Sequence, residues 1–228
     1  MSLKRRLAAP VLALAALAMG CQAPAFATER QVLAPAASRA ANEGAGLKTA
    51  VFAGGCFWGI EGVFSHVQGV TGAVSGYHGG ARGAATYDKV SNGNTGHAEA
   101  VRVTYDPRVV RYDQLLRIFF SVGADPTQLN RQGPDTGTQY RSALVPLGEE
   151  QLLVANAYLA QLRASGLWKG PVVTRIEANR GFFPAETHHQ DFMAKNPNHP
   201  YIQAWDVAKV RGLQRMFPGF YKAAFTTG

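Results

Sequence analysis

Residues 49–67 read TAVFAGGCFWGIEGVFSHV and join an apolar strand to a helix through a single cysteine. The run 49–53 is apolar throughout and suits a short buried strand, and the glycines before Cys56 end it with backbone freedom. Cys56 is therefore expected at a helix N-terminus, where unpaired amides and the positive end of the helix stabilise a thiolate and lower the thiol pKa. The alternative is a buried structural cysteine. The helical spacing that follows is carried by Phe57, Ile60, Phe64 and Val67.

Strand and helix patterns alternate along the rest of the chain. The order indicates a two-layer α/β or α+β sandwich around one core, and the sequence pattern does not decide between them. A Gly-rich stretch over 78–96 is expected to be a long loop that is functional or mobile. The predicted strands cover 70–77, 98–105, 142–147 and 172–178, and the predicted helices cover 113–122, 149–164 and 184–195.

Glu99 lies within the strand pattern HAEAVRVTY of residues 97–105. Alternation places it on the same face as Val101, Val103 and Tyr105, which is apolar. Burial there would raise the carboxyl pKa and keep the group protonated near neutrality, the condition for a general acid. The alternative is a glutamate at a strand edge with solvent access or with Arg102 as its partner.

The N-terminus reads as an export signal. Three basic residues at 4–6 precede an apolar stretch over 7–19 that is too short to span a bilayer as an anchor. Cleavage after Ala27 is favoured, and the alternative is lipid attachment at Cys21. The expected organisation is a signal peptide over 1–27, a flexible leader over 28–47, a catalytic domain over 48–200 and a tail over 201–228 that packs on the domain. Either way Cys56 is the only free thiol of the mature protein, and no intramolecular disulfide is possible.

The composition excludes several classes of function. The 228 residues are 46% hydrophobic and 17% charged, which fits one compact domain. The formal charge of +8 falls to about +5 without the three signal residues, and no run of Lys or Arg indicates nucleic acid. No second cysteine and no His-x-x-x-His spacing supports a metal site. A Cys-His acyl-transfer enzyme with His97 or His189 as base and Gln139 as oxyanion donor stays open, as does a non-catalytic binding module.

Several separated blocks resemble the A-type peptide methionine sulfoxide reductases. The match extends through most of residues 48–200, and the order of the blocks is that of the family. The blocks are GCFWG (55–59), GYHGG (76–80), TYDKVSNGNTGHAEAVRVTYDP (86–107), RQGPDTGTQYRS (131–142) and the PAExxHQ pattern of 184–190.

The resemblance implies a role for each matching residue. It makes Cys56 the nucleophile and Glu99 the acid, and it gives Asp135 a supporting role. Attack of the thiolate on the sulfur of the S epimer, with Glu99 protonating the oxygen, would release methionine and leave a sulfenic acid on Cys56. Tyr87 and Tyr140 would donate hydrogen bonds to the sulfoxide oxygen, and Phe57 and Trp58, with Gly55 beside them, would bind the substrate methyl group.

The resemblance also sets expectations for fold and partners. It implies a ferredoxin-like α+β sandwich with a mixed or antiparallel sheet. Many family members carry resolving cysteines near the C-terminus, whereas residues 190–228 contain none. The sulfenic acid would therefore need an external thiol reductant, thioredoxin-like or small, and no bound cofactor. With the export signal, the expectation is a monomeric periplasmic enzyme that repairs oxidised envelope proteins.

Overall fold

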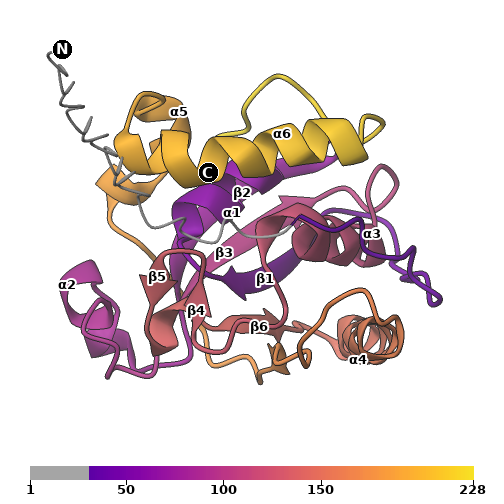
Figure 1. Ribbon diagram of the computed structural model, residues 1–228, viewed down its shortest axis with the longest axis horizontal. Coiled ribbons are helices and arrows are strands. Elements are labelled where there is room, and N and C mark those ends of the chain that lie inside the picture. The colour runs from indigo at the N-terminus through magenta and orange to yellow at the C-terminus, as the bar shows by residue number, and fades with distance from the viewer. Residues whose placement is uncertain (1–30) are drawn as a thin grey trace, which may run out of the picture.

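The strand-to-helix unit around Cys56 forms as the pattern predicts. The computed structural model describes residues 31–228, so the expected signal segment and Cys21 lie outside the described residues. Strand β1 (Lys48–Gly54) runs into helix α1 (Phe57–Ser65), and Cys56 is the residue that caps the helix N-terminus. This unit lies at the centre of the molecule (Figure 1).

One mixed sheet of six strands carries the site. Its order is β7-β6-β1-β3-β2-β8, and every pair is antiparallel except β6 with β7. The expectation of an α+β fold with a mixed sheet is thereby confirmed. Besides β1, the strands are β2 (Val70–His78), β3 (Ala98–Tyr105), β6 (Ser142–Val145), β7 (Arg175–Ile176) and β8 (Phe182–Pro184).

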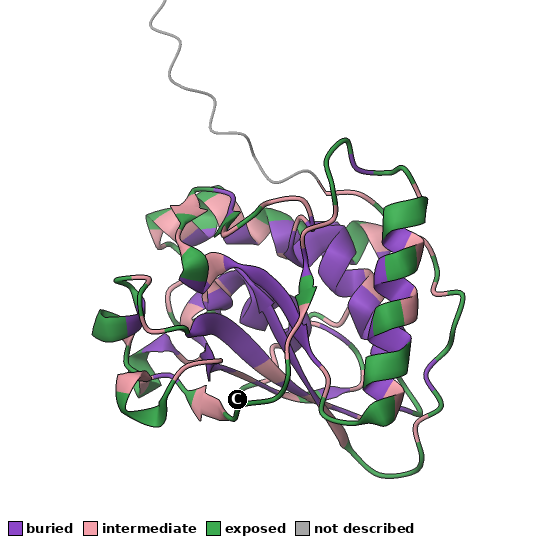
Figure 2. Cartoon of the chain, turned by 90° about the horizontal axis from the view of Figure 1, so that it is seen from below, coloured by how far each residue is buried: buried purple, intermediate pink, exposed green. Residues whose placement is uncertain are grey.

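The two faces of the sheet bury different side chains. Helices α1, α3 (Tyr112–Ile118) and α4 (Glu149–Ala164) contribute to one large apolar core with the face that carries Phe52 and Val101. The other face buries small side chains such as Ala53 and Ala100, with Phe182 packed against them. Figure 2 shows the buried strands beneath helices whose outer sides are exposed. Alternation along β1 and β3 explains this division, because successive side chains point to opposite faces.

Four predicted segments differ from the structure. The 78–96 loop contains a 3-10 turn (Arg82–Ala84) and the short helix α2 (Tyr87–Val90). The predicted 113–122 helix is α3 followed by a π turn (Phe119–Gly123), and the predicted 172–178 strand pairs only at β7. The predicted 184–195 helix is divided into the end of β8, a 3-10 turn (Thr187–His189) and α5 (Phe192–Lys195). A small hairpin also forms from β4 (Arg131–Gln132) and β5 (Asp135–Thr136), followed by a 3-10 turn (Thr138–Tyr140).

The described part of the expected leader, residues 31–47, is bound to the domain instead of being a free flexible segment. Ala34 and Ala41 are buried, and their amides donate to Ser121 Oγ and Asp113 Oδ1, each at 2.9 Å. Glu43 accepts hydrogen bonds from the Tyr105 hydroxyl and from the Tyr112 amide. The sequence pattern of residues 31–47 did not predict these contacts. They are hydrogen bonds to residues far away in the sequence, and such bonds leave no periodic pattern of apolar residues.

The C-terminal segment contains helical structure. A π turn (Ile202–Asp206) leads into helix α6 (Val207–Met216), which lies alongside α1 (Figure 1). Further on, Val67 forms a bridge with Tyr221, and the Lys222 ammonium donates to the Val70 carbonyl at 2.9 Å. Within 31–228, no helix has the length and apolar character needed to cross a bilayer.

Candidate functional site

The site begins at the turn that presents Cys56 at the N-terminus of α1. Gly55 has φ of +92°, a conformation that L side chains rarely adopt. A Cβ there would lie 2.5 Å from Gln132 Cβ, so only glycine lets the two segments approach. Gln132 in turn bonds the Asp125 backbone through both ends of its amide, at 3.0 and 2.8 Å. The cysteine is therefore held by a close-packed turn and keeps partial exposure.

Glu99 lies directly beside this turn. Its Oε2 accepts a hydrogen bond from the Phe57 amide at 3.0 Å, and the side chain is 2% exposed. Burial raises the pKa of Glu99 to about 8, and Asp135 adds to the rise while the Phe57 amide opposes it. The prediction that Glu99 is buried on the apolar face of β3 is thus confirmed, and its raised pKa favours the neutral form. Such a group can donate a proton to an oxygen that gains charge.

The thiol of Cys56 does not have the lowered pKa that its helix position predicts. Burial raises the pKa well above the usual value, and the charges of Glu99, Asp206 and Asp135 raise it further. The Trp58 amide, at the helix N-terminus, lowers the pKa but is outweighed. Sequence reasoning considered the helix alone and missed the carboxyls that the fold brings around it. At neutral pH both Cys56 and Glu99 hold their protons in the resting site.

Tyr87, Tyr140 and Asp135 all lie close enough to Glu99 and Cys56 to affect one another electrostatically. Burial, together with these acidic neighbours, raises the pKa of both tyrosine hydroxyls, which keeps them as hydrogen-bond donors. The three residues come from α2, from the turn after β5 and from β5 itself. The structure therefore brings together the polar residues that the resemblance named.

Phe57 and Trp58 lie in an aromatic cluster beside the cysteine. Trp58 stacks on Phe192 with ring centres 3.7 Å apart and an angle of 5°. The edge of Tyr201 meets Trp58 at 5.8 Å, and Phe57 packs on Tyr77 at 5.8 Å. Trp58 keeps partial exposure, whereas Phe57 is buried. The cluster gives the site an apolar wall of the kind that suits a methyl group.

Three residues that sequence reasoning did not single out complete the site. The Tyr201 hydroxyl donates to Asp135, and burial, with Cys56 and Asp135 close by, raises the Tyr201 pKa. Asp206 packs on Gly59 so closely that a Cβ there would clash, which brings its carboxyl to the first turn of α1. Glu186 accepts from the Tyr77 hydroxyl and the Tyr87 amide, both at 2.9 Å, and so positions α2. The PAExxHQ block contained the signal for Glu186, but nothing local indicates Tyr201 or Asp206.

The histidines are engaged elsewhere than at the thiol. His189 Nδ1 accepts the Trp58 indole hydrogen at 3.2 Å, and burial, with His188 beside it, lowers the His189 pKa. His97 Nδ1 accepts from the Gly80 amide at 3.2 Å, and its Nε2 meets the Ala81 carbonyl at 3.0 Å. A base that takes the Cys56 proton needs a ring nitrogen in hydrogen-bond reach of Sγ. His189 Nε2 has no hydrogen-bond partner within residues 31–228, but neither His97 nor His189 is hydrogen-bonded to Cys56 there, so the geometry gives no support to the Cys-His acyl-transfer alternative. Among residues 31–228, no group of three or more candidate ligands could hold a metal ion.

Fold and site together define an α+β thiol enzyme, in which a cysteine and a carboxylic acid with a raised pKa lie close to two tyrosine hydroxyls. The family model described as peptide methionine sulfoxide reductase matches residues 48–217. The chain belongs to this family and is an oxidoreductase that acts on methionine sulfoxide, which confirms the resemblance seen in the sequence. The match runs past the expected domain end at residue 200 and includes α6.

Relatives and solved structures agree with this assignment. The chain is 53% identical over 176 residues to the peptide methionine sulfoxide reductase MsrA 2 of Mesorhizobium japonicum, covering 77% of this chain and 90% of that protein. It is 48% identical over 178 residues to MsrA 2 of Synechocystis, covering 78% and 83%. The reduced crystal structure of Mxr1 from Saccharomyces cerevisiae aligns with a TM-score of 0.61 at 32% identity, covering 67% of this chain and 87% of that one. Methionine sulfoxide reductase A of Corynebacterium diphtheriae aligns with a TM-score of 0.57 at 37% identity, covering 68% and 77%.

Proposed function

We propose that the protein reduces the S epimer of methionine sulfoxide, free or in proteins, through a sulfenic acid on Cys56. The observation that carries this proposal is the pairing of Cys56 with the neutral carboxyl of Glu99, which is bonded to the amide next to the cysteine at 3.0 Å. A nucleophilic sulfur and a proton donor are the two groups that removal of a sulfoxide oxygen requires.

The reaction balances with the groups present. Cys56 Sγ forms a bond to the sulfoxide sulfur while the oxygen takes the Glu99 proton, and Tyr87 and Tyr140 donate hydrogen bonds to that oxygen. The oxygen then passes to Cys56 Sγ as hydroxyl, and the electron pair of the sulfur–sulfur bond returns to the methionine sulfur. The thiol proton restores Glu99. The net change is Cys–SH plus sulfoxide to Cys–SOH plus methionine: the substrate sulfur gains two electrons and the cysteine sulfur loses two.

The wall of Phe57 and Trp58 supports the substrate assignment. The methyl group of methionine sulfoxide is apolar and its oxygen is polar, and the site has an aromatic side and a hydroxyl-rich side to match. Asp135, held by Tyr201, supports the polar side through its charge. Because Gly55 has no Cβ, the turn that carries Cys56 can pack closely against Gln132.

Recycling needs a thiol from outside. Cys56 is the only cysteine among residues 31–228, so no second thiol of that region can attack the sulfenic acid. An external thiol of a thioredoxin-like protein or a small molecule would displace water to give a mixed disulfide, and a second thiol would release Cys56. No bound cofactor takes part in these steps.

We place the enzyme in the periplasm, as a monomer that repairs oxidised envelope proteins. The support is the basic start and apolar stretch of residues 4–19, which lie outside the described residues. Lipid anchoring through Cys21 is the alternative. The N-terminal residue of the mature protein, read by mass spectrometry, distinguishes cleavage after Ala27 from a lipid-modified Cys21.

We also interpret the core as ferredoxin-like. The four central strands have the order β6-β1-β3-β2 and are antiparallel throughout, with α1 between β1 and β2 and α3 between β3 and β6.

The decisive experiment compares the separated epimers. The mature protein is incubated with S or R methionine sulfoxide and excess dithiothreitol, and released methionine is measured for wild type and for Cys56→Ser. We expect methionine from the S epimer alone, and none from the variant. Turnover of neither epimer by folded wild type would refute the proposal, and Cys56 would then be examined for acyl adducts.

A further inference from the structure

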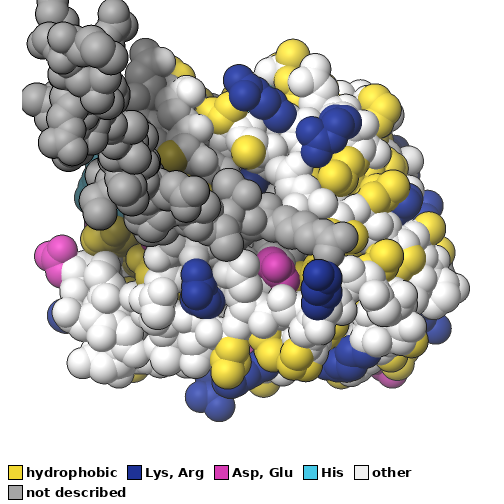
Figure 3. All heavy atoms as spheres, viewed as in Figure 1, with side chains coloured by type: hydrophobic (Ala, Val, Ile, Leu, Met, Phe, Trp, Pro, Cys, Tyr) yellow, Lys and Arg dark blue, Asp and Glu magenta, His cyan; other side chains and the backbone are white. Residues whose placement is uncertain are grey.

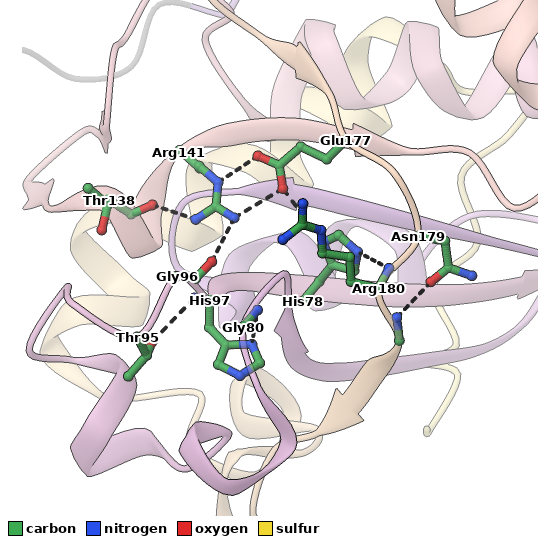
Figure 4. Close-up of polar contacts among 11 residues, drawn as sticks. His78, Gly80, Thr95, Gly96, His97, Thr138, Arg141, Glu177, Asn179 and Arg180 are labelled. Carbon is green, nitrogen blue, oxygen red and sulfur yellow. Dashed lines mark hydrogen bonds and ion pairs between the residues drawn. The ribbon is translucent and has the colours of Figure 1, made fainter.

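A cavity of about 580 Å³ is lined by residues 93–96 before β3, by Thr138 and Arg141 before β6, and by residues 175–180. Its floor is an ion pair: the Arg141 guanidinium donates to both oxygens of Glu177, at 2.7 and 3.0 Å. Burial opposes ionisation of Glu177, but His78, with Nδ1 3.7 Å from Oε2, and the hydrogen bonds from Arg141 outweigh it and lower the Glu177 pKa to about 2. Figure 4 shows the Arg141 and Glu177 side chains facing each other, with His78 and Arg180 beside them.

Arg141 connects the floor of the cavity to two segments that carry site residues. Arg141 also donates to the Thr138 carbonyl at 3.0 Å and to the Gly96 carbonyl at 3.1 Å. Gly96 belongs to the segment that carries Tyr87 and Glu99, and Thr138 to the segment that carries Asp135 and Tyr140. The cavity therefore shares its walls with the site while lying outside it.

The rim of the cavity carries an excess of positive charge. Glu177 neutralises Arg141, but Arg175 and Arg180, both exposed, form no ion pair with any residue of the described chain. The side chains of Asn94 and Asn130 also line the cavity and make no hydrogen bond within residues 31–228. Two arginines with two amides can bind a carboxylate by paired and charge-assisted hydrogen bonds.

The distance to the cysteine site suits a peptide. Gly96 is three residues from Glu99, so their α-carbons are at most about 11 Å apart. An extended peptide rises about 3.3 Å per residue, so three to four residues span the separation of Gly96 and Glu99.

We propose that this cavity binds the carboxylate of an aspartate or glutamate two to four residues from the methionine sulfoxide of a protein substrate. The proposal rests on the proposed function, since it extends the same site along the substrate chain. It gives the enzyme a preference for oxidised methionines in acidic surroundings.

The test uses blocked peptides with one S sulfoxide and a single Glu placed in turn at each position up to four residues away. Each has a matched peptide with Gln at that position, and dithiothreitol is the reductant, so no protein partner contributes. For wild type we expect kcat/KM to be about fivefold higher with Glu than with Gln at one or more positions two to four residues away. This ratio is the size of effect expected when one carboxylate forms ion pairs with two exposed arginines. In the double variant Arg175→Gln, Arg180→Gln this ratio should fall to about one.

Controls separate the possible failures. Arg163→Gln removes an exposed arginine of α4 away from the cavity and should keep the preference. N-acetyl methionine sulfoxide amide should be reduced equally by wild type and double variant. A Glu-to-Gln ratio of one in wild type, an unchanged ratio in the double variant, or a preference that arises only with a protein reductant would each overturn the cavity proposal. Failure of wild type to reduce the small amide would instead refute the proposed function.

Discussion

At the scale of single residues, the site depends on where two protons lie. Cys56 and Glu99 both have raised pKa values because the fold buries them together, and Asp135 adds negative charge to both. A thiolate formed beside an ionised Glu99 would be strongly disfavoured. In the proposed mechanism the form that reacts therefore has Glu99 protonated, and the sulfoxide oxygen accepts this proton.

Activity should therefore decline as Glu99 ionises. The Glu99 pKa is raised to about 8, so the neutral acid predominates below that pH and is lost above it. We expect kcat/KM of wild type to fall about tenfold per pH unit above about pH 8. Glu99→Gln should lower kcat/KM about 10²- to 10⁴-fold and remove this fall. Initial rates across the pH range measure both effects, and a variant that retains the same descending limb would contradict the assignment.

The residues that sequence reasoning could predict are those whose pattern is local. Glu99 was predictable because alternation along one strand shows which face a residue occupies. Tyr201 and Asp206 were not, because they reach Asp135 and Gly59 across the fold from a segment with no motif of its own. The raised pKa of Cys56 was missed for the same reason, since it depends on carboxyls that only the tertiary structure assembles.

At the scale of elements, α1 carries a buried carboxyl group, that of Glu61, on its inner side. Glu61 is fully buried, and burial raises its pKa to about 7, against the opposing effect of the Asp191 and Ser75 amides nearby. In the unfolded chain the carboxyl has its ordinary lower pKa. The folded state therefore binds the proton more tightly, and its stability contribution is complete below the unfolded pKa and is lost as the pH rises through about 7.

Replacing this carboxyl should flatten the pH dependence of stability. Between about pH 5 and about pH 8.5, wild type should lose on the order of 2 kcal/mol more of its unfolding free energy than Glu61→Gln does. Urea unfolding followed by tryptophan fluorescence at the two pH values gives the difference. Glu150→Gln, which removes an exposed ion pair with Arg39, is the control and should follow wild type. Equal slopes for Glu61→Gln and wild type would contradict the assignment.

Helices and strands were predicted correctly where one repeat of apolar residues continues over the whole element. The limits of β3 and α4 match the predicted ones, because alternation and amphipathic spacing continue to their ends. The pattern failed at the π turn after α3, which adds a residue to the helical repeat. It also failed at β7, where only two residues pair, since a run of alternating residues does not show how much of it meets a partner.

The segment before β1 should contribute to stability through Glu43. Its carboxylate accepts the Tyr105 hydroxyl and the Tyr112 amide at the start of α3. Glu43→Ala leaves both donors without this partner and should lower the unfolding free energy by about 1–3 kcal/mol. Glu43→Gln, which keeps one acceptor oxygen, should lose less. Thermal and urea unfolding measure the order, and no loss in either variant would show that residues 31–47 are not bound in solution.

At the scale of the whole molecule, five separated segments meet where the central strand β1 ends and its antiparallel neighbour β3 begins. Helix α1, strand β3, the α2 loop, the β4–β5 hairpin and the segment before α6 each supply a residue of the site. On the face that Figure 3 shows, Lys and Arg lie singly among uncharged and apolar side chains, without a continuous stripe. The basic side chains of this face are therefore spread out, in contrast to the concentrated charge that nucleic-acid binding requires.

Under the proposed mechanism, Cys56, the only thiol among residues 31–228, fixes the stoichiometry of the enzyme. Without a reductant, each molecule can reduce one sulfoxide and then stops, because no second cysteine converts the sulfenic acid to a disulfide. We expect a burst of one methionine per chain, with Cys56 heavier by one oxygen and captured by dimedone in intact-mass spectra. Dithiothreitol added after the burst should restore steady turnover. Two methionines per chain in the burst, or an oxidised enzyme that does not react with dimedone, would mean that another group of the protein accepts the oxygen or the electrons.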